Sequence, residues 1–194
     1  MQEELLNSLI KQYNGKMVLG CGHIDYNEKG YFNTDIRKKP KGKDHIQYEI
    51  DANEPLPIGD GQLSEILAES VLEHLPHNIE GVPDSMRMTN SIKVLREWLR
   101  VLKPGGKLII KVPNLEGIFK QYIAKRISVI DLIGYIYGGG EYKENYHLAG
   151  FDKPILSACL RAAGAKKFEF FNAHNYKDKF NPDRDWEIGA VATK

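Results

Sequence analysis

Apolar residues along this chain fall into helical stripes and short runs, which predict an alternation of helices and strands. Residues 91–102 give the clearest helix, because one face is apolar and the other carries charged side chains. Its apolar stripe consists of Val94, Leu95, Trp98, Leu99 and Leu102. A second helix begins at Asp152, a side chain suited to an N-cap, and ends at Gly164. Residues 3–13 read as a short amphipathic helix.

Seven segments have the apolar character and the flanking turn residues of strands. They span residues 16–19, 31–36, 45–50, 63–68, 107–112, 167–171 and 186–192. Because helices separate strands in this order, we expect a doubly wound, mostly parallel α/β sheet of seven strands. No helix separates the last two strands, so the last strand is expected to run antiparallel to the rest. A polar turn and the start of a helix are expected at residues 70–74.

Two connections depart from the usual pattern of such a sheet. Only residues 21–30 separate the first two strands, which is too few for a full crossover helix, so we expect a turn or an extended loop. Residues 114–150 are rich in isoleucine, tyrosine and glycine and are too long for a plain loop, which makes them a candidate cap over a substrate. We therefore expect residues 1–194 to form a single domain with a cap-like insertion at about 114–150.

Composition and charge place the chain among ordinary globular proteins. Hydrophobic residues make up 42%, charged residues 27%, and the formal net charge is +1, so nucleic-acid and membrane partners are not expected. The basic run at 37–43 predicts a solvated loop, or alternatively a patch that attracts a phosphorylated or polyanionic substrate. With two cysteines far apart and no signal-peptide pattern, we expect a reduced cytoplasmic protein without a metal site.

Residues that could bind a ligand follow the ends of the predicted strands. In an open parallel sheet ligands bind at the carboxyl ends of the strands. Gly20 and Gly22 follow the first strand, and glycines there let the backbone approach a ligand closely. Asp35 ends the second strand, where a carboxylate can accept hydrogen bonds from both hydroxyls of a ribose.

Several segments, taken in order, resemble the motifs of class I S-adenosylmethionine-dependent methyltransferases. They are the glycine loop at 18–22, Asp35, residues 51–57, VLEHL at 71–75, LREWLRVLKPGG at 95–106 and the helix at 151–164. The KPGG turn between an amphipathic helix and an apolar strand is the most specific of them. The GYFNTD segment at 30–35 also resembles the GWxNxD of a compact subgroup of predicted methyltransferases with the same short first connection.

The resemblance implies a Rossmann-like methyltransferase fold and S-adenosyl-L-methionine as cofactor. Asp35 would bind the ribose, and the segment beginning at Asp51 would contact the adenine. The implied cofactor-binding residues are Gly20, Cys21, Gly22, Asp35, Ile36, Asp51, Ala52 and Glu69. Two of these have a second interpretation, Asp51 as the start of a turn and Glu69 as a helix cap. The expected reaction is methyl transfer to an oxygen, nitrogen or carbon of a small-molecule or glycan-like acceptor.

The catalytic candidates are His147 and His74. His147 lies beside the predicted cap, where it would either contact substrate or act as a general base. His74 follows Glu73 near the end of the fourth strand, and its alternative role is that of a hydrogen-bonded histidine packed beneath the cleft.

Two other classes of protein stay open at this point. A non-catalytic methyltransferase fold is favoured by the short first connection and by Val18, where the family often has an acid. A nicotinamide-dependent oxidoreductase would need a third glycine after Gly20 and Gly22, which the chain lacks. The retained glycines and Asp35 favour the methyltransferase.

Overall fold

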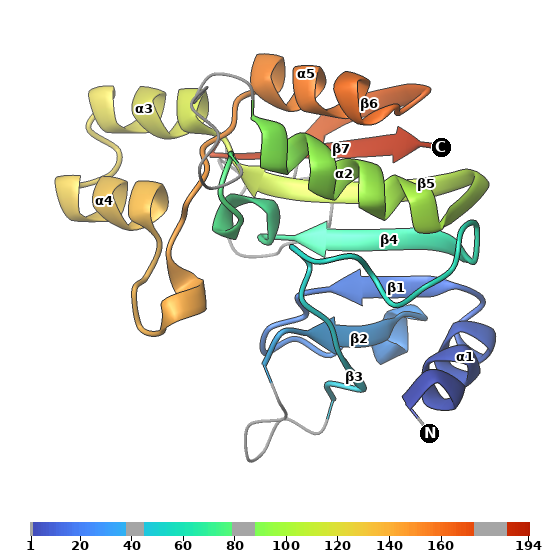
Figure 1. Ribbon diagram of the computed structural model, residues 1–194. Coiled ribbons are helices and arrows are strands. Elements are labelled where there is room, and N and C mark those ends of the chain that lie inside the picture. Colours follow the sequence, from blue (N-terminus) through green and yellow to red (C-terminus); the bar gives the residue numbers. More distant parts are fainter. Residues whose placement is uncertain (1, 38–44, 79–87, 173–185) are drawn as a thin grey trace.

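The computed structural model describes residues 2–37, 45–78, 88–172 and 186–194, and their strands form one seven-stranded sheet (Figure 1). The strand order is β3-β2-β1-β4-β5-β7-β6. The strands are β1 (Lys16–Leu19), β2 (Phe32–Asp35), β3 (Tyr48–Glu49), β4 (Leu63–Glu69), β5 (Leu102–Pro113), β6 (Lys167–Asn172) and β7 (Glu187–Thr193). Neighbours from β3 to β5 are parallel, and β7 is antiparallel to both β5 and β6. The predicted sheet with its antiparallel last strand is confirmed.

The helices agree with the sequence patterns at most positions. They are α1 (Gln2–Gln12), α2 (Thr89–Val101), α3 (Leu115–Ile123), α4 (Val129–Tyr137) and α5 (Lys153–Ala163), with the 3₁₀ turns η1 (Asn27–Lys29), η2 (Leu72–His74) and η3 (Lys143–Asn145). Helix α5 begins as predicted, since the Asp152 carboxylate accepts a hydrogen bond from the Ile155 amide at 2.8 Å. It ends at Gly164, whose φ of 99° is the left-handed conformation that glycine tolerates.

The helix predicted to begin at residues 70–74 is wrong. Only the 3₁₀ turn η2 follows β4, and Leu75 after it is extended, with φ −97° and ψ 137°. Leu75 precedes Pro76, whose ring disfavours a helical conformation in the residue before it. The chain therefore leaves the sheet in a single tight turn, which keeps Glu73 and His74 at the end of β4.

The core lies mainly on one face of the sheet. Apolar residues of α1, α2 and α5 join alternate strand residues in one large cluster that includes the fully buried Trp98. The intervening strand residues Val18, Leu67 and Ile109 belong to a smaller cluster on the opposite face. In that smaller cluster, Tyr26 from the β1–β2 connection packs where a crossover helix would otherwise lie.

The predicted short connection between β1 and β2 is confirmed, because the 3₁₀ turn η1 is the helical structure it contains. The buried Asn33 side chain holds this connection in place. Its amide nitrogen donates to the Asp25 carboxylate at 2.7 Å and to the His45 carbonyl at 3.1 Å, and its oxygen accepts from the Tyr26 amide at 3.0 Å. One side chain on β2 thereby replaces the hydrogen bonds that a helix would make internally.

Residues 114–150 carry α3, α4 and η3, and they leave and re-enter the body of the protein at neighbouring points. Asn114, directly after β5, forms a bridge with Phe151, directly before α5. Within the segment, α4 starts with a capping box between Ser128 and Asp131. Several apolar side chains of α3 and α4 are exposed, namely Phe119, Tyr122, Ile123, Val129, Ile130, Ile133 and Tyr137. The segment thus projects from the edge of the sheet at which the parallel strands end (Figure 1).

Two further predictions concern the basic run and membrane spans. Of the basic run at 37–43, only Arg37 belongs to the residues that the structure describes. Among the described residues, each helix is too short or too polar to cross a membrane.

We expect Asn33→Ala to destabilise the fold strongly. The substitution leaves the buried Tyr26 amide and the His45 carbonyl without their partner, which should cost on the order of 3 kcal/mol in free energy of unfolding. Chemical denaturation measures this difference, with Glu28→Ala in the same connection as an exposed control. Equal stability of the two variants would show that Asn33 does not organise the connection.

Candidate functional site

A cavity of about 400 Å³ opens at the carboxyl ends of β1, β2 and β4. The sheet reverses its winding between β1 and β4, and ligands bind at such switch points. The cavity brings together six of the predicted cofactor-binding residues and one catalytic candidate. They are Gly20, Gly22, Asp35, Ile36, Asp51, Ala52 and His74.

Three predicted residues do not line this cavity. Cys21 is 3% exposed and lies under the glycine loop, where its amide donates to the Thr34 carbonyl at 2.9 Å. Glu69 pairs with Lys111 at 2.5 Å and accepts a hydrogen bond from the Tyr26 hydroxyl at 3.0 Å, so it caps no helix. His147 lies behind His74, with 4.8 Å between the centroids of the two rings.

The glycine loop needs residues without a side chain. Gly20 has φ 64°, and a Cβ built on it would lie 2.7 Å from Cγ2 of Val71 on the neighbouring connection. Gly22 has φ 62°, again in the left-handed region. The loop therefore presents bare backbone to the cavity, as the sequence predicted.

Asp35 is held at the end of β2 by hydrogen bonds to both of its oxygens. Oδ2 accepts from the Gly22 amide at 2.8 Å and from Nη2 of Arg37 at 3.1 Å. Oδ1 accepts from the amide and Nε of Arg37 at 3.1 and 2.8 Å. Burial opposes ionisation of the carboxyl, but the hydrogen bonds from Arg37 and Gly22 outweigh it and hold the pKa of Asp35 below its ordinary value.

Arg37 connects this carboxylate to the helical insertion. Its guanidinium lies 5.1 Å from the centroid of the Tyr142 ring, so it forms a cation–π contact while it pairs with Asp35. Both Arg37 and Tyr142 line the cavity. Arg37 thus fills the space beside the predicted ribose-binding acid and ties it to the opposite wall.

Helix α2 fixes the loop that carries Asp51 and Ala52. The Trp98 indole donates to the Ala52 carbonyl at 3.1 Å, and the Asn90 amide donates to the side-chain oxygen of Asn53 at 2.8 Å. The Asp51 carboxylate accepts from the Asn53 amide at 2.8 Å. Asp51 therefore opens a turn, as its second sequence interpretation has it, and also lines the cavity. Its contact with an adenine stays a prediction.

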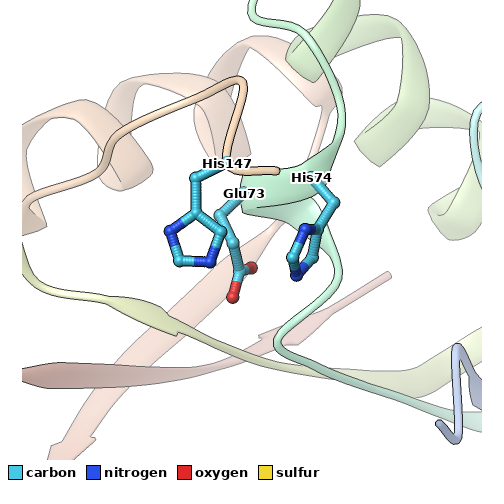
Figure 2. A group of neighbouring side chains, drawn as sticks. All are labelled: Glu73, His74 and His147. Atoms are coloured by element: carbon cyan, nitrogen blue, oxygen red, sulfur yellow. The ribbon is translucent and has the colours of Figure 1, made fainter. Parts of the chain in front are cut away.

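His74, His147 and Glu73 lie together beside the cavity (Figure 2). Nδ1 of His74 lies 3.1 Å from the Tyr146 carbonyl, and Nδ1 of His147 lies 3.0 Å from the Tyr135 carbonyl. Burial lowers the pKa of His74, and burial together with the neighbouring His74 lowers the pKa of His147. Burial also raises the pKa of the Glu73 carboxyl, to about 8.

Sequence reasoning missed Glu73 and the pairing of Arg37 with Asp35. Arg37 belongs to a basic run that reads as a solvated loop, and nothing in its spacing indicates a contact with Asp35 two residues before it. Glu73 offers a better signal, because it is a carboxylate inside the apolar run VLEHL. A charged side chain in such a run is either paired or functional.

Residues 16–110 match the family model of the methyltransferase domain, and this stretch contains the glycine loop, Asp35 and the loop pinned by α2. This segment is a class I methyltransferase domain. Its parallel strands and its site agree with the order of motifs in the sequence.

The chain is also similar to curated methyltransferases and to solved structures. The chain is 32% identical over 92 residues to the ubiquinone/menaquinone biosynthesis C-methyltransferase UbiE of Enterobacter sp. (strain 638), a match that covers 44% of this chain and 37% of that relative. The chain thus spans little more than a third of the length of the curated relatives it matches.

Two solved structures share the fold over nearly the whole chain. A SAM-dependent methyltransferase from Archaeoglobus fulgidus has a TM-score of 0.57 at 15% identity, covering 99% of this chain and 92% of that one. Phosphoethanolamine N-methyltransferase 2 of Haemonchus contortus, in complex with S-adenosyl-L-methionine, has a TM-score of 0.50 at 14% identity, covering 97% and 51%. At these identities the likeness shows the Rossmann-like fold.

We expect both cysteines to resist alkylation in the folded protein. Burial, reinforced by the charge of Asp35, raises the pKa of the Cys21 thiol to about 12, and burial raises that of Cys159 to about 11. Because the thiolate is the reactive form, iodoacetamide at pH 8 should label neither residue until the protein is unfolded. Mass spectrometry of native and denatured samples measures the labelling. Rapid native labelling of Cys21 would contradict its burial under the glycine loop.

Proposed function

We propose that this protein transfers the methyl group of S-adenosyl-L-methionine to an oxygen, nitrogen or carbon atom of a small-molecule or glycan-like acceptor. The observation that carries the proposal is the meeting of the glycine loop, Asp35 and the Asp51 loop on one cavity. The left-handed backbone at Gly20 and Gly22, and the close approach of Val71 to Gly20, favour glycine at both positions. A ligand with a ribose and a flat base suits these three elements.

The cavity walls suggest where each part of the cofactor would lie. The bare backbone around Gly20 and Gly22 would face the amino-acid end, and Asp35 would accept hydrogen bonds from the ribose hydroxyls. Ile36 and Ala52 would pack against the adenine, with Asp51 beside it. Cys21, which is buried, and Glu69, which is half-buried, would act from behind the loop as supports of its shape.

Ribose binding requires a change at Arg37. A carboxylate offers about four acceptor positions, and the Gly22 amide and three Arg37 groups fill that number on Asp35. The ribose hydroxyls can bind Asp35 when the Arg37 guanidinium moves away. In the free protein, Arg37 would thus occupy the position of the ribose on Asp35, and cofactor binding would displace Arg37.

The helical insertion supplies the acceptor side of the cavity. Tyr142, Lys143, Glu144 and Leu148 line the wall opposite the sheet. Amides of Leu148 and Ala149 donate to the Glu73 carbonyl at 2.8 and 3.0 Å, which anchors the insertion to the end of β4. We propose that residues 114–150 cap the bound substrates within a single domain and keep water from the reacting atoms.

The bound cofactor supplies an activated methyl group, so the protein need mainly align the acceptor and exclude water. Such positioning can contribute up to roughly 7–11 kcal/mol in favourable systems. His74 lines the cavity, and the His147 ring packs against the His74 ring, so these two residues would orient the acceptor atom or hold its proton. Both carry lowered pKa values and are neutral near pH 7, the form that accepts a proton or a cation.

The same residues argue against the two rival functions. A non-catalytic module has no need for an acid aimed at a ribose, and a nicotinamide-dependent enzyme would need a third glycine where this chain has Asp25. A small-molecule acceptor, a cytoplasmic location and the lack of a nucleic-acid partner stay predictions. The acceptors named for the relatives belong to those proteins.

S-Adenosylhomocysteine should stabilise the protein, and NAD should not. A ligand at about one hundred times its Kd raises the unfolding free energy by about 2.7 kcal/mol, which corresponds to a rise in Tm of roughly 5–10 °C for a chain of this size. A thermal-shift measurement with each ligand tests this. Stabilisation by NAD alone would favour the oxidoreductase, and stabilisation by neither would favour the non-catalytic module.

Substitutions at Asp35 and Arg37 should change cofactor affinity in opposite directions. Asp35→Ala removes the acceptor of two ribose hydroxyls and should weaken binding of S-adenosylhomocysteine by roughly 10- to 100-fold. Arg37→Ala removes the competing guanidinium and should strengthen binding by roughly threefold to tenfold. Calorimetric titration measures both, with Glu28→Ala as an exposed control. Weaker binding in both variants would show that Arg37 holds the ligand and does not compete with it.

A further inference from the structure

Glu73, His74 and His147 form a compact group that the methyl-transfer chemistry alone does not require. One ligand atom of each residue lies within 4.8 Å of those of the other two. Figure 2 shows the Glu73 carboxylate between the two imidazole rings. Glu73 and His74 come from η2 after β4, and His147 comes from the returning end of the helical insertion. Sequence spacing does not predict the group, because the fold brings its two parts together.

Hydrogen bonds fix which nitrogen of each ring is free. Nδ1 of His74 and Nδ1 of His147 each face a backbone carbonyl, and a carbonyl only accepts hydrogen bonds. Both Nδ1 atoms therefore carry the proton and donate it. In a neutral ring, Nε2 then keeps its lone pair. Metal-binding histidines have this arrangement, in which a carbonyl orients the ring through the other nitrogen.

The Glu73 carboxylate lacks the hydrogen bonds that its burial calls for. The residue is 1% exposed, and neither side-chain oxygen forms a hydrogen bond of normal geometry to a described residue. A buried carboxylate with so few partners is strongly unfavourable unless a proton or a cation neutralises it. The backbone of Glu73 is meanwhile held firmly, because its carbonyl accepts from the amides of Leu148 and Ala149. The Glu73 side chain is thus kept beside the two rings, and the polar groups near it are the Ser70 side chain and its own backbone.

We propose that Glu73, His74 and His147 bind a divalent transition-metal cation, with Nε2 of each histidine and one oxygen of Glu73 as ligands. Two imidazoles and one carboxylate suit Mn²⁺, Fe²⁺, Co²⁺ or Zn²⁺, whereas Mg²⁺ and Ca²⁺ prefer oxygen alone. Metal–ligand bonds of about 2.0–2.2 Å place neighbouring ligand atoms roughly 3–3.5 Å apart. Binding would therefore draw the three side chains slightly closer together.

This cation site would determine the chemical class of the methyl acceptor. That inference rests on the proposed function. Three protein ligands leave coordination positions open, and His74 places the cation at the wall of the cavity. A hydroxyl bound there loses its proton to water more readily. Its oxygen then forms the bond to the methyl carbon, the carbon–sulfur bond breaks, and the sulfonium becomes a neutral thioether. The acceptor would thus be a hydroxyl compound that can coordinate a cation.

Metal titration of the whole protein tests the site without any acceptor. After treatment with EDTA and dialysis, the wild-type protein should bind one equivalent of Co²⁺ and develop visible absorption bands. His147→Ala and Glu73→Gln should each weaken this binding by at least roughly 10- to 100-fold, because even the loss of an outer-shell partner has that effect. His23→Ala, at an exposed histidine, is the matched control and should bind like wild type. Circular dichroism checks that each variant is folded.

The outcomes separate this site from the proposed function. Wild-type binding of Co²⁺ that is lost in His147→Ala or Glu73→Gln but kept in His23→Ala supports the site, whether or not S-adenosylhomocysteine binds. Equal Co²⁺ affinity of wild type and the folded ligand variants would overturn it. Absence of Co²⁺ binding in a wild-type protein that binds S-adenosylhomocysteine would also overturn it, while the methyltransferase proposal would stand.

Discussion

The structure depends on a parallel pair of strands that is joined without a helix. β1 and β2 must run in the same direction and lie side by side, although only one 3₁₀ turn lies between them. The buried Asn33 amide makes this connection stable by bonding to Asp25, Tyr26 and His45. The glycine loop is the first part of that connection, and Asp35 follows Asn33 on the same strand. The floor of the cavity therefore takes its shape from one buried side chain.

The other wall of the cavity depends on backbone groups. Both histidine rings are oriented by carbonyls of the insertion, and the insertion is bound in turn to the Glu73 carbonyl. The two histidine side chains are thus positioned by chain segments that meet only after folding. Cofactor binding and acceptor binding would be controlled by separate halves of the molecule, which Arg37 links through Asp35 and Tyr142.

Sequence patterns predicted the sheet well because each strand alternates or concentrates apolar residues in a way that only one arrangement buries. They failed where a neighbour decides the outcome. The strand predicted at 45–50 shrinks to Tyr48–Glu49, since it pairs with β2 alone at the edge of the sheet. The helix predicted from Ser70 ends after one turn because of Pro76. The roles of Arg37 and Glu73 depend on distances across the fold, which no local pattern contains.

The missing crossover helix also bears on the order of folding. Met17 pairs with Phe32 on one side and with Ile66 on the other, and both pairings are parallel. The second pairing closes a loop roughly three times longer, and each doubling of a loop adds about 0.6 kcal/mol of closure entropy. Most parallel pairs must first form an intervening helix, whereas this pair needs only a short loop and one asparagine. Pairing of β1 with β2 therefore costs less closure entropy than pairing of β1 with β4. The strands that carry the glycine loop and Asp35 would accordingly pair before β4 joins them.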